Sequence, residues 1–355
     1  MKTSFLKNAL IVPVAALSLT GLIQAQDDQA NATPKPKFAV LHPKPGANLE
    51  QPEVKLPTWT GSFSYNGHSY SYVMVGKAPT SNAATTIKTY IIPIKVVIGS
   101  HTFDPTHVLT NGNTVIQNTV ASPIFDKTTT YIQGGVNVGK TQYIDAYQRA
   151  NFWGQVQTNT NYHLRLGVPT VLAEQTLTPP ANQSSTGNAF GVSAGIVNIN
   201  WFDAKIQPLL KTLAIPANSL PIFLTYDVYL SDNSGLSGCC IGGYHSYTGV
   251  QAYSEFTYAD VVGAFSQNVS ALSHEIGEWA DDPETNNSSP CGILEVGDPL
   301  EGNPNYGAYP YSLHGFTYDL QDLVTLPYFG APPSTSVNSW FTFQGESLKV
   351  CENGS

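Results

Sequence analysis

Residues 258–281 read YADVVGAFSQNVSALSHEIGEWAD and contain the longest helical pattern of the chain. Apolar residues recur there at intervals of three and four, which is the spacing of one face of an α-helix. Asp282-Pro283 follows and ends the pattern. We therefore expect a long helix from Tyr258 to Asp281.

Residues 274–278 within this stretch read HEIGE, an H-E-x-x-E motif. His274 and Glu278 are four residues apart, so on a helix they share one face and can bind one metal ion. Glu275 can then act as the general base for a metal-activated water. The structural alternative is that Glu275 and Glu278 are solvated helix residues and His274 is a helix cap.

A catalytic zinc site needs a third protein ligand. The segment EVGD (295–298) follows the helix at a spacing that suits it, with Glu295 as first choice. Asp298 is the alternative, or a partner that holds His274 in one tautomer. His245 can line the cleft and stabilise an oxyanion, and His314 is a second candidate for that task.

The ligand set predicts which ion binds. Zn²⁺ is expected, but Glu278 and Glu295 would supply two carboxylates in place of neutral imidazoles. Two carboxylates lower the Lewis acidity of the ion and make the harder ions Mn²⁺ and Ca²⁺ more competitive.

The remaining chain is predicted from its local patterns to mix strands and helices. β-branched and aromatic runs predict strands, and intervals of three or four predict helices. The expected strands are 63–75, 86–98, 128–138, 196–201 and 222–230, and the other expected helices are 141–153 and 202–213. The aromatic, Pro-rich tail from Tyr306 is expected to wrap the fold.

The N-terminus predicts export. Residues 1–25 combine Lys2 and Lys7 with an apolar run and a plausible cleavage position after Ala25, as in a signal peptide. Residues 26–57 are rich in Pro, Gln, Ala and Lys and are expected to form a flexible linker. We expect a secreted protein, extracellular or periplasmic, with no membrane association after cleavage.

Export permits disulfides, and the four cysteines are Cys239, Cys240, Cys291 and Cys351. Three pairings are possible. Because adjacent cysteines bond each other with strained geometry, we expect Cys239 and Cys240 to bond separately to Cys291 and Cys351.

The net charge is −9 and only 12% of the residues are charged, so nothing indicates a nucleic-acid partner. The expected partner is a protein or peptide substrate, and the protein is expected to be a monomer.

Three segments resemble one family in the same order. SHEIGEWADDP (273–283) resembles the "SHELAE…P" stretch of the EXORDIUM/phosphate-induced protein family, and EVGDPLEG (295–302) resembles its "EIGDLCEG" stretch. CCIGGYH (239–245) is similar to its Cys- and His-containing loop, "C-G-x-H". Pro299-Leu300 replaces the family cysteine after the Gly-Asp pair. The resemblance implies a secreted, zincin-like protein.

These observations together predict an α+β fold with a zincin-like metallopeptidase core, in which a long HExxE helix lies against a mixed sheet. A β-rich N-terminal lobe is expected at 58–200 and the metal-binding lobe at 201–355. The expected function is a secreted zinc metallopeptidase that hydrolyses peptide bonds. The alternative is a non-catalytic extracellular or cell-wall-associated binding protein with a structural metal site.

Two competing patterns predict other functions. GGVNVGKT (134–141) matches the phosphate loop of nucleotide-binding proteins, although an exported protein has no ready nucleotide supply. A glycosidase needs two carboxylates across a sugar site, and Glu275 with Glu295 or Asp298 offers such a pair.

Overall fold

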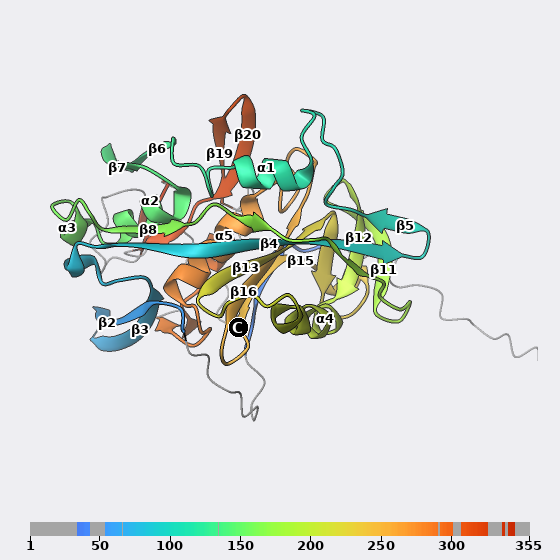
Figure 1. The fold of residues 1–355 in the computed structure, drawn as a ribbon, viewed down its shortest axis with the longest axis horizontal. Helices are drawn as coiled ribbons and strands as arrows, with labels where there is room; N and C mark the ends of the chain where they lie inside the picture. Colours follow the sequence, from blue (N-terminus) through green and yellow to red (C-terminus); the bar gives the residue numbers. More distant parts are fainter. Residues whose placement is uncertain are drawn as a thin grey trace, which may run out of the picture. The chain divides into compact units, whose positions relative to one another are not determined.

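Strand β4 (Ala84–Ile98) is the longest strand and organises the main sheet (Figure 1). Its first half alternates between exposed and buried residues, whereas its second half is almost continuously buried. This change in pattern is typical of a strand that moves from a half-solvated edge into a core. The computed structural model describes residues 34–42, 54–65, 67–133, 135–289, 292–300, 307–325, 336–337 and 340–344.

The main sheet has twelve strands, is mixed and is nearly closed on itself. Its central path runs β10-β4-β13-β16-β15-β14-β12-β11, and β1, β5, β8 and β9 pair at its sides. Besides β4, its members are β1 (Lys37–Leu41), β5 (His101–Phe103), β8 (His163–Leu166), β9 (Thr170–Val171), β10 (Gln175–Leu177), β11 (Ser184–Ala189), β12 (Val192–Asn198), β13 (Ser219–Tyr226), β14 (Val228–Ser231), β15 (Cys239–Tyr247) and β16 (Ala252–Tyr258).

Smaller hairpins and sheets flank this sheet. They comprise β2 (Thr58–Tyr65) with β3 (His68–Val75), β6 (Thr130–Gln133) with β7 (Val136–Lys140), β17 (Ser288–Ser289) with β18 (Gly292–Ile293), β19 (Ala308–Leu313) with β20 (Phe316–Gln321), and β21 (Val324–Thr325) and β22 (Ser336–Val337) on either side of β23 (Trp340–Thr342). The α-helices are α1 (Val115–Ala121), α2 (Tyr143–Asn151), α3 (Trp153–Val156), α4 (Ile199–Thr212) and α5 (Ser270–Asp281).

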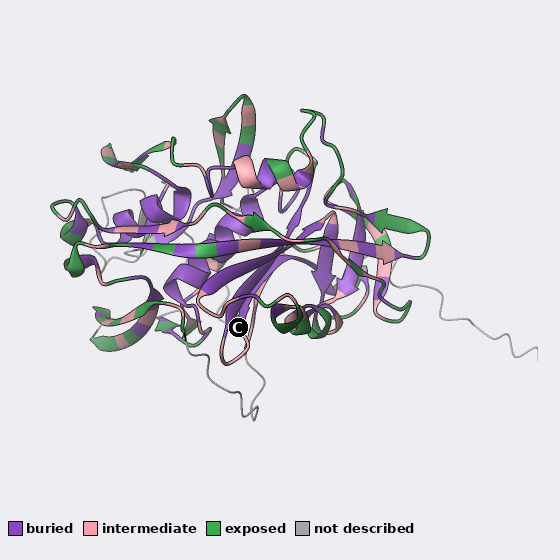
Figure 2. Ribbon diagram, viewed as in Figure 1, coloured by how far each residue is buried: buried purple, intermediate pink, exposed green. Residues whose placement is uncertain are grey.

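Helices α4 and α5 cover opposite faces of the sheet at β13. Side chains alternate between the two faces of a strand. In β13, Ile222 and Leu224 belong to the hydrophobic core that includes Ile276 of α5. Phe223, between them, belongs to the core that includes Phe202 of α4. The two cores therefore lie on the two faces of one sheet, and Figure 2 shows its central strands fully buried.

The predicted zincin-like core is wrong. Among the described residues, strands account for 44% and helices for 20%, and the largest element is the nearly closed mixed sheet rather than a long helix against a sheet. The HExxE helix α5 has only 12 residues. The expected helix from Tyr258 fails in its first half because Gly263, Ser266 and Asn268 have positive φ, which interrupts any helix. Main-sheet strands also come from both sides of residue 200.

The Asn268 side chain explains where α5 begins. Its Oδ1 accepts hydrogen bonds from the backbone N–H of Val269 and of Asp319 in β20. Asn tolerates the left-handed conformation, in which its short side chain bonds nearby backbone. Val261 and Phe265 upstream of it match helical spacing, but they contact the core from a loop, and Val262 is exposed.

Three other expectations differ from the structure or lie beyond it. Cys239 and Cys240 form a disulfide with each other, contrary to the separate pairing we expected, and Cys291 and Cys351 lie outside the described residues. The signal-peptide region also lies outside them. The segment predicted as a linker contains β1, which pairs in parallel with β15.

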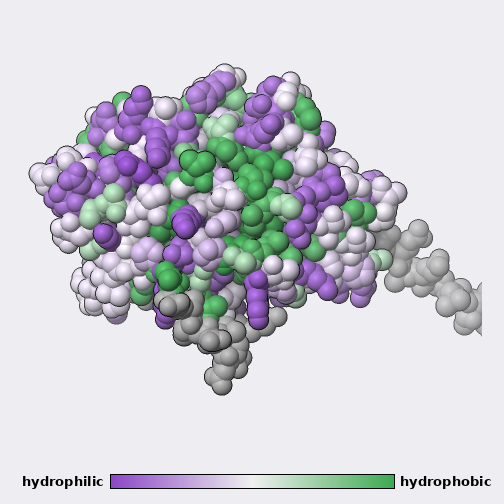
Figure 3. Space-filling view, viewed as in Figure 1, coloured by the Kyte–Doolittle hydropathy of each residue, from purple (hydrophilic) through white to green (hydrophobic). Residues whose placement is uncertain are grey.

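The described residues, from 34 onward, belong to one compact unit. None of the helices in the described ranges is long and apolar enough to cross a membrane. On the face seen in Figure 3, apolar residues gather in the middle and polar residues surround them.

Candidate metal centre

Helix α5 carries the HExxE motif in the interior of the protein. All twelve of its residues are buried, and it packs against β15, β16, β20 and β3 (Figure 2). His274 Nε2 lies 2.9 Å from Glu278 Oε1, one helical turn away. The two side chains therefore meet on one face, as their four-residue spacing predicts, and the solvated-helix alternative is excluded by their burial.

The segment that follows β18 brings a third donor to this pair. Asp298 Oδ1 lies 3.3 Å from His274 Nε2, and the backbone N–H of Gly297 donates to Glu278 Oε1 at 3.1 Å. A side chain at position 297 would collide with the imidazole, because an added Cβ would lie 2.1 Å from His274 Nδ1. The glycine thus allows residues 295–298 to approach the helix closely.

Gln321, at the end of β20, fixes the tautomer of His274. Its Oε1 is only an acceptor, so the hydrogen bond between them places the imidazole proton on Nδ1. The backbone N–H of Gln321 donates to Ser273 Oγ at 2.7 Å, which ties the strand to the helix. In the neutral form of His274, the lone pair of Nε2 then faces the carboxylates of Glu278 and Asp298.

His245, on β15, repeats this arrangement on the other side of Glu278. Its Nε2 lies 3.2 Å from the carbonyl oxygen of Asp282, an acceptor, so Nε2 carries the proton. Its Nδ1 lies 3.5 Å from both Glu275 Oε2 and Glu278 Oε2. Gly243 makes room for Glu275, whose Oε1 would lie 2.8 Å from an added Cβ.

The electrostatics of the centre follow from burying several carboxylates together. Burial raises the pKa of Glu275 to about 7 and, with the neighbouring Glu278 carboxylate, raises the pKa of Glu295 well above its ordinary value. Burial alone would lower the pKa of His274, but Glu278 and Asp298 raise it well above the usual range. His274 in turn holds the pKa of Glu278 well below its ordinary value, against the effect of burial.

These donors fit a divalent cation. Among the described residues, two groups place their donor atoms within 4.8 Å of one another: His274 with Glu278 and Asp298, and His245 with Glu275 and Glu278. Nitrogen and carboxylate oxygen are donors that Zn²⁺ and Mn²⁺ accept. Both carboxylate oxygens of Glu295 are buried beside Glu278, and burying this carboxylate costs free energy unless a proton or a cation compensates its charge.

The structure brings together most of the residues expected from the sequence. Asp298, the alternative third ligand, joins His274 and Glu278, whereas the first choice, Glu295, lies beside Glu278. His314 lies at the exposed turn between β19 and β20, where its Nε2 is 3.5 Å from Asp126 Oδ2. It takes no part in the centre.

Two contributors were not anticipated. Gln321 is 47 residues from His274 in the sequence, and Phe38 stacks on the His274 ring with centroids 3.6 Å apart. No local pattern marks either residue. Phe38 reaches the centre because β1 pairs with the distant strand β15, and Gln321 reaches it because β20 packs against α5.

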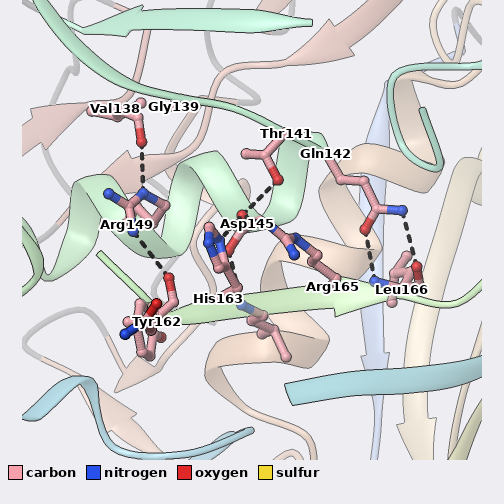
Figure 4. A network of polar contacts seen from close by, with 12 residues as sticks. Val138, Gly139, Thr141, Gln142, Asp145, Arg149, Tyr162, His163, Arg165 and Leu166 are labelled. Carbon is pink, nitrogen blue, oxygen red and sulfur yellow. Dashed lines mark hydrogen bonds and ion pairs between the residues drawn. The ribbon is translucent and has the colours of Figure 1, made fainter. Parts of the chain in front are cut away.

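The competing phosphate-loop motif forms a different structure. β6 (Thr130–Gln133) and β7 (Val136–Lys140) pair as antiparallel strands, where a phosphate loop would have a strand followed by a loop and a helix. Figure 4 shows two hydrogen bonds that connect this segment to α2. Thr141 Oγ1 donates to Asp145 Oδ2 at 2.6 Å, and Arg149 Nε donates to the carbonyl oxygen of Val138 at 2.7 Å. The hydroxyl that a phosphate loop offers to magnesium is therefore bonded to a carboxylate.

Comparison with protein-family models, with characterised proteins and with solved structures finds no match to this chain.

Proposed function

We propose that this protein is a metal-dependent hydrolase that cleaves peptide bonds. His274, Glu278 and Asp298 would hold the ion, with Glu295 beside them. The observation that carries the proposal is the orientation of His274: its Nδ1 is bonded to Gln321, and its Nε2 lies 2.9 Å from Glu278 and 3.3 Å from Asp298. A metal-ligating histidine has this arrangement, with its second nitrogen fixed by a hydrogen bond.

A divalent ion in this position would supply Lewis acidity, which lowers the pKa of water and polarises a carbonyl group. Glu275 is the group placed to accept a proton. Burial raises the pKa of Glu275 to about 7, so at neutral pH it can both accept a proton and return it to a leaving amine. Burial alone would lower the pKa of His245, but Glu275 and Glu278 raise it to about 10, and in its protonated form His245, with Nδ1 3.5 Å from Glu275, would orient that carboxylate and stabilise negative charge.

The remaining parts of the proposal do not rest on the geometry of the centre. The HExxE motif favours Zn²⁺ and a peptide substrate over other ions and esters. The signal-like N-terminus supports a secreted protein, and a monomer is the simplest assembly. The segments 239–245, 273–283 and 295–302 support a relationship to the EXORDIUM/phosphate-induced protein family.

Metal analysis of protein purified without affinity-tag chelation tests the proposal first. Wild type should retain bound zinc or manganese, and Glu278→Ala should retain far less, because Glu278 contacts both histidines. Glu174→Gln serves as a control, since Glu174 pairs with Lys95 outside the centre. Wild type without any affinity for divalent ions would contradict the proposal.

Glu275→Gln then separates catalysis from metal binding. The variant should keep its fold and lose the cleavage of a broad peptide pool, tested from acidic to neutral pH. If wild type binds the ion but cleaves no peptide under any of these conditions, the hydrolase proposal fails.

The second candidate is an extracellular binding protein with a structural metal ion. Burial favours it: the side chain of His274 is 0% exposed and that of Glu278 2%, and only Asp298, at 25%, reaches solvent. Structural sites are closed, whereas catalytic sites keep an open position. This candidate predicts that removing the ion lowers thermal stability and that no peptide is cleaved.

A further inference from the structure

The two oxygens of Glu278 face two different donor groups. Oε1 lies 2.9 Å from His274 Nε2, and Oε2 lies 3.5 Å from His245 Nδ1. The second group consists of His245, Glu275 and Glu278, and its donor atoms lie within 4.8 Å of one another. Glu278 is therefore shared between two sets of donors, each with one imidazole and a second carboxylate.

Two of the three side chains in the second group have buried donor atoms that lack a hydrogen-bond partner in the described part of the chain. His245 and Glu275 are 0% exposed, and neither His245 Nδ1 nor either Glu275 oxygen has a hydrogen-bond partner among the described residues. The distance of 3.5 Å from His245 Nδ1 to each carboxylate exceeds that of a normal N–H···O hydrogen bond. Because Nε2 faces a carbonyl oxygen, a neutral His245 directs its lone pair from Nδ1 toward both carboxylates.

Lone pairs from three buried side chains that converge on one point repel one another unless a proton or a metal cation lies between them. A divalent ion can take the place of that proton and contact all three side chains, because their donor atoms lie within 4.8 Å of one another. The geometry therefore favours a second cation.

We propose that a second divalent cation binds between His245, Glu275 and Glu278, with Glu278 giving one carboxylate oxygen to each of the two ions. The inference rests on the metal centre of the proposed function. The donors, one imidazole nitrogen and carboxylate oxygens, select Zn²⁺ or Mn²⁺ over soft ions such as Cu⁺. A cation there occupies the Glu275 carboxylate, so it blocks proton transfer, and excess metal inhibits the hydrolase.

Counting ions tests the inference directly. The full-length protein is stripped with a chelator and titrated with Zn²⁺ and, separately, Mn²⁺, and bound ions are counted by native mass spectrometry and by calorimetry. Wild type should bind two ions per chain with separable affinities. His245→Ala should bind one, and Glu275→Gln, which keeps the size of the side chain, should weaken the second ion at least tenfold. A wild type that saturates at one ion overturns the inference.

Two comparisons distinguish a failure of the second cation site from a failure of the whole metal centre. His163→Ala removes a histidine that pairs with buried Asp145 at 2.7 Å outside the centre (Figure 4), and it should still bind two ions. If wild type binds none, the metal centre itself fails. If wild type binds two but His245→Ala also binds two, the centre stands and the second position is wrong. Peptide cleavage by wild type should rise with the first equivalent of metal and fall with the second.

Discussion

The imidazole of His274 lies against the phenyl ring of Phe38, with ring centroids 3.6 Å apart and planes inclined by 23°. Phe38 belongs to β1, whose Val40 is in register with His245 on β15. One short strand near the N-terminus therefore lies beside both histidines of the centre. The ring excludes water from one face of His274 and so strengthens the electrostatic interactions of that imidazole.

Phe38→Ala should weaken both the fold and metal binding. Removing a buried phenylalanine side chain costs about 3–5 kcal/mol of unfolding free energy, and it also opens the His274 ring to water. Denaturant unfolding and competition with a chelator measure the two effects. Leu41→Ala is the matched control: Leu41 is on the same strand but packs against the core on the α4 side of the sheet. It should lose stability without a change in metal affinity, and an equal loss of affinity in both variants would contradict the role of Phe38.

Gln321→Met should lower metal affinity about 10–100-fold, the usual effect of removing the hydrogen bond that orients a ligating histidine. Methionine keeps the length of the side chain but cannot accept the proton on His274 Nδ1. Gln148→Met is the control, because Gln148 is also buried but bonds Asp281 instead of the centre. Chelator competition on the two purified variants measures the difference. Unchanged affinity in Gln321→Met would mean that the tautomer of His274 is set by another group.

Gly297→Ala should disrupt the centre more than Gly277→Ala. The new Cβ at 297 would lie 2.1 Å from the ring of His274, which is already held by Gln321 and Phe38 and cannot move away. At 277 the new Cβ would lie 2.4 Å from Leu323 Cδ1, the end of a flexible side chain, and alanine favours a helix. Metal content and thermal melting of both variants test this prediction. A greater loss in Gly277→Ala than in Gly297→Ala would contradict it.

The sequence predicted that His274 and Glu278 lie together, but it did not predict the fold around them. His274 and Glu278 meet because helical spacing alone brings residues i and i+4 together. The zincin-like fold was wrong because the apolar residues of 258–269 match helical spacing while Ser266 and Asn268 adopt positive φ. Hydrophobic periodicity depends on which side chains are apolar. It carries no information on the backbone φ angles that interrupt a helix.

Other differences depend on contacts between distant segments. Residues 239–245 resemble a family loop, yet they form the buried strand β15 and place His245 beside Glu275. Its continuously buried pattern gives no alternation to recognise. In the same way, β1 lies in a Pro-rich stretch that reads as a linker, and only its pairing with β15 makes it a strand.

A buried carboxyl group joins α2 to α5 outside the metal centre. Asp281 accepts a hydrogen bond from Gln148 Nε2 through Oδ1, and its Oδ2 lies 3.1 Å from Tyr147 Oη. Tyr147 has one hydroxyl proton. Its Oη lies closer to the carbonyl oxygen of Val324, at 2.8 Å, than to Asp281. If that proton goes to Val324, Asp281 must supply the proton shared with Tyr147. Burial raises the pKa of Asp281 to about 7, which agrees with a neutral carboxyl group.

The pH dependence of stability follows from this pKa. An aspartate in the unfolded chain has a pKa near 3.9, so between about pH 4 and pH 7 the folded protein binds more protons than the unfolded chain. Asp281 therefore destabilises the fold progressively as pH rises through that window, and its cost is complete above about pH 7. Asp281→Asn should remove this contribution, because its amide can accept from Gln148 and donate to Tyr147.

Thermal melting of Asp281→Asn and wild type from pH 4 to pH 8 tests the sign. The variant should gain stability relative to wild type as pH rises, with the largest difference at pH 8. Asn151, whose buried Oδ1 lacks a partner among the described residues, can flip its amide and accept from the new side chain. A difference that is constant with pH would show that Asp281 keeps the same charge in the folded and unfolded states. A difference that shrinks toward pH 8 would show that the folded protein holds Asp281 ionised.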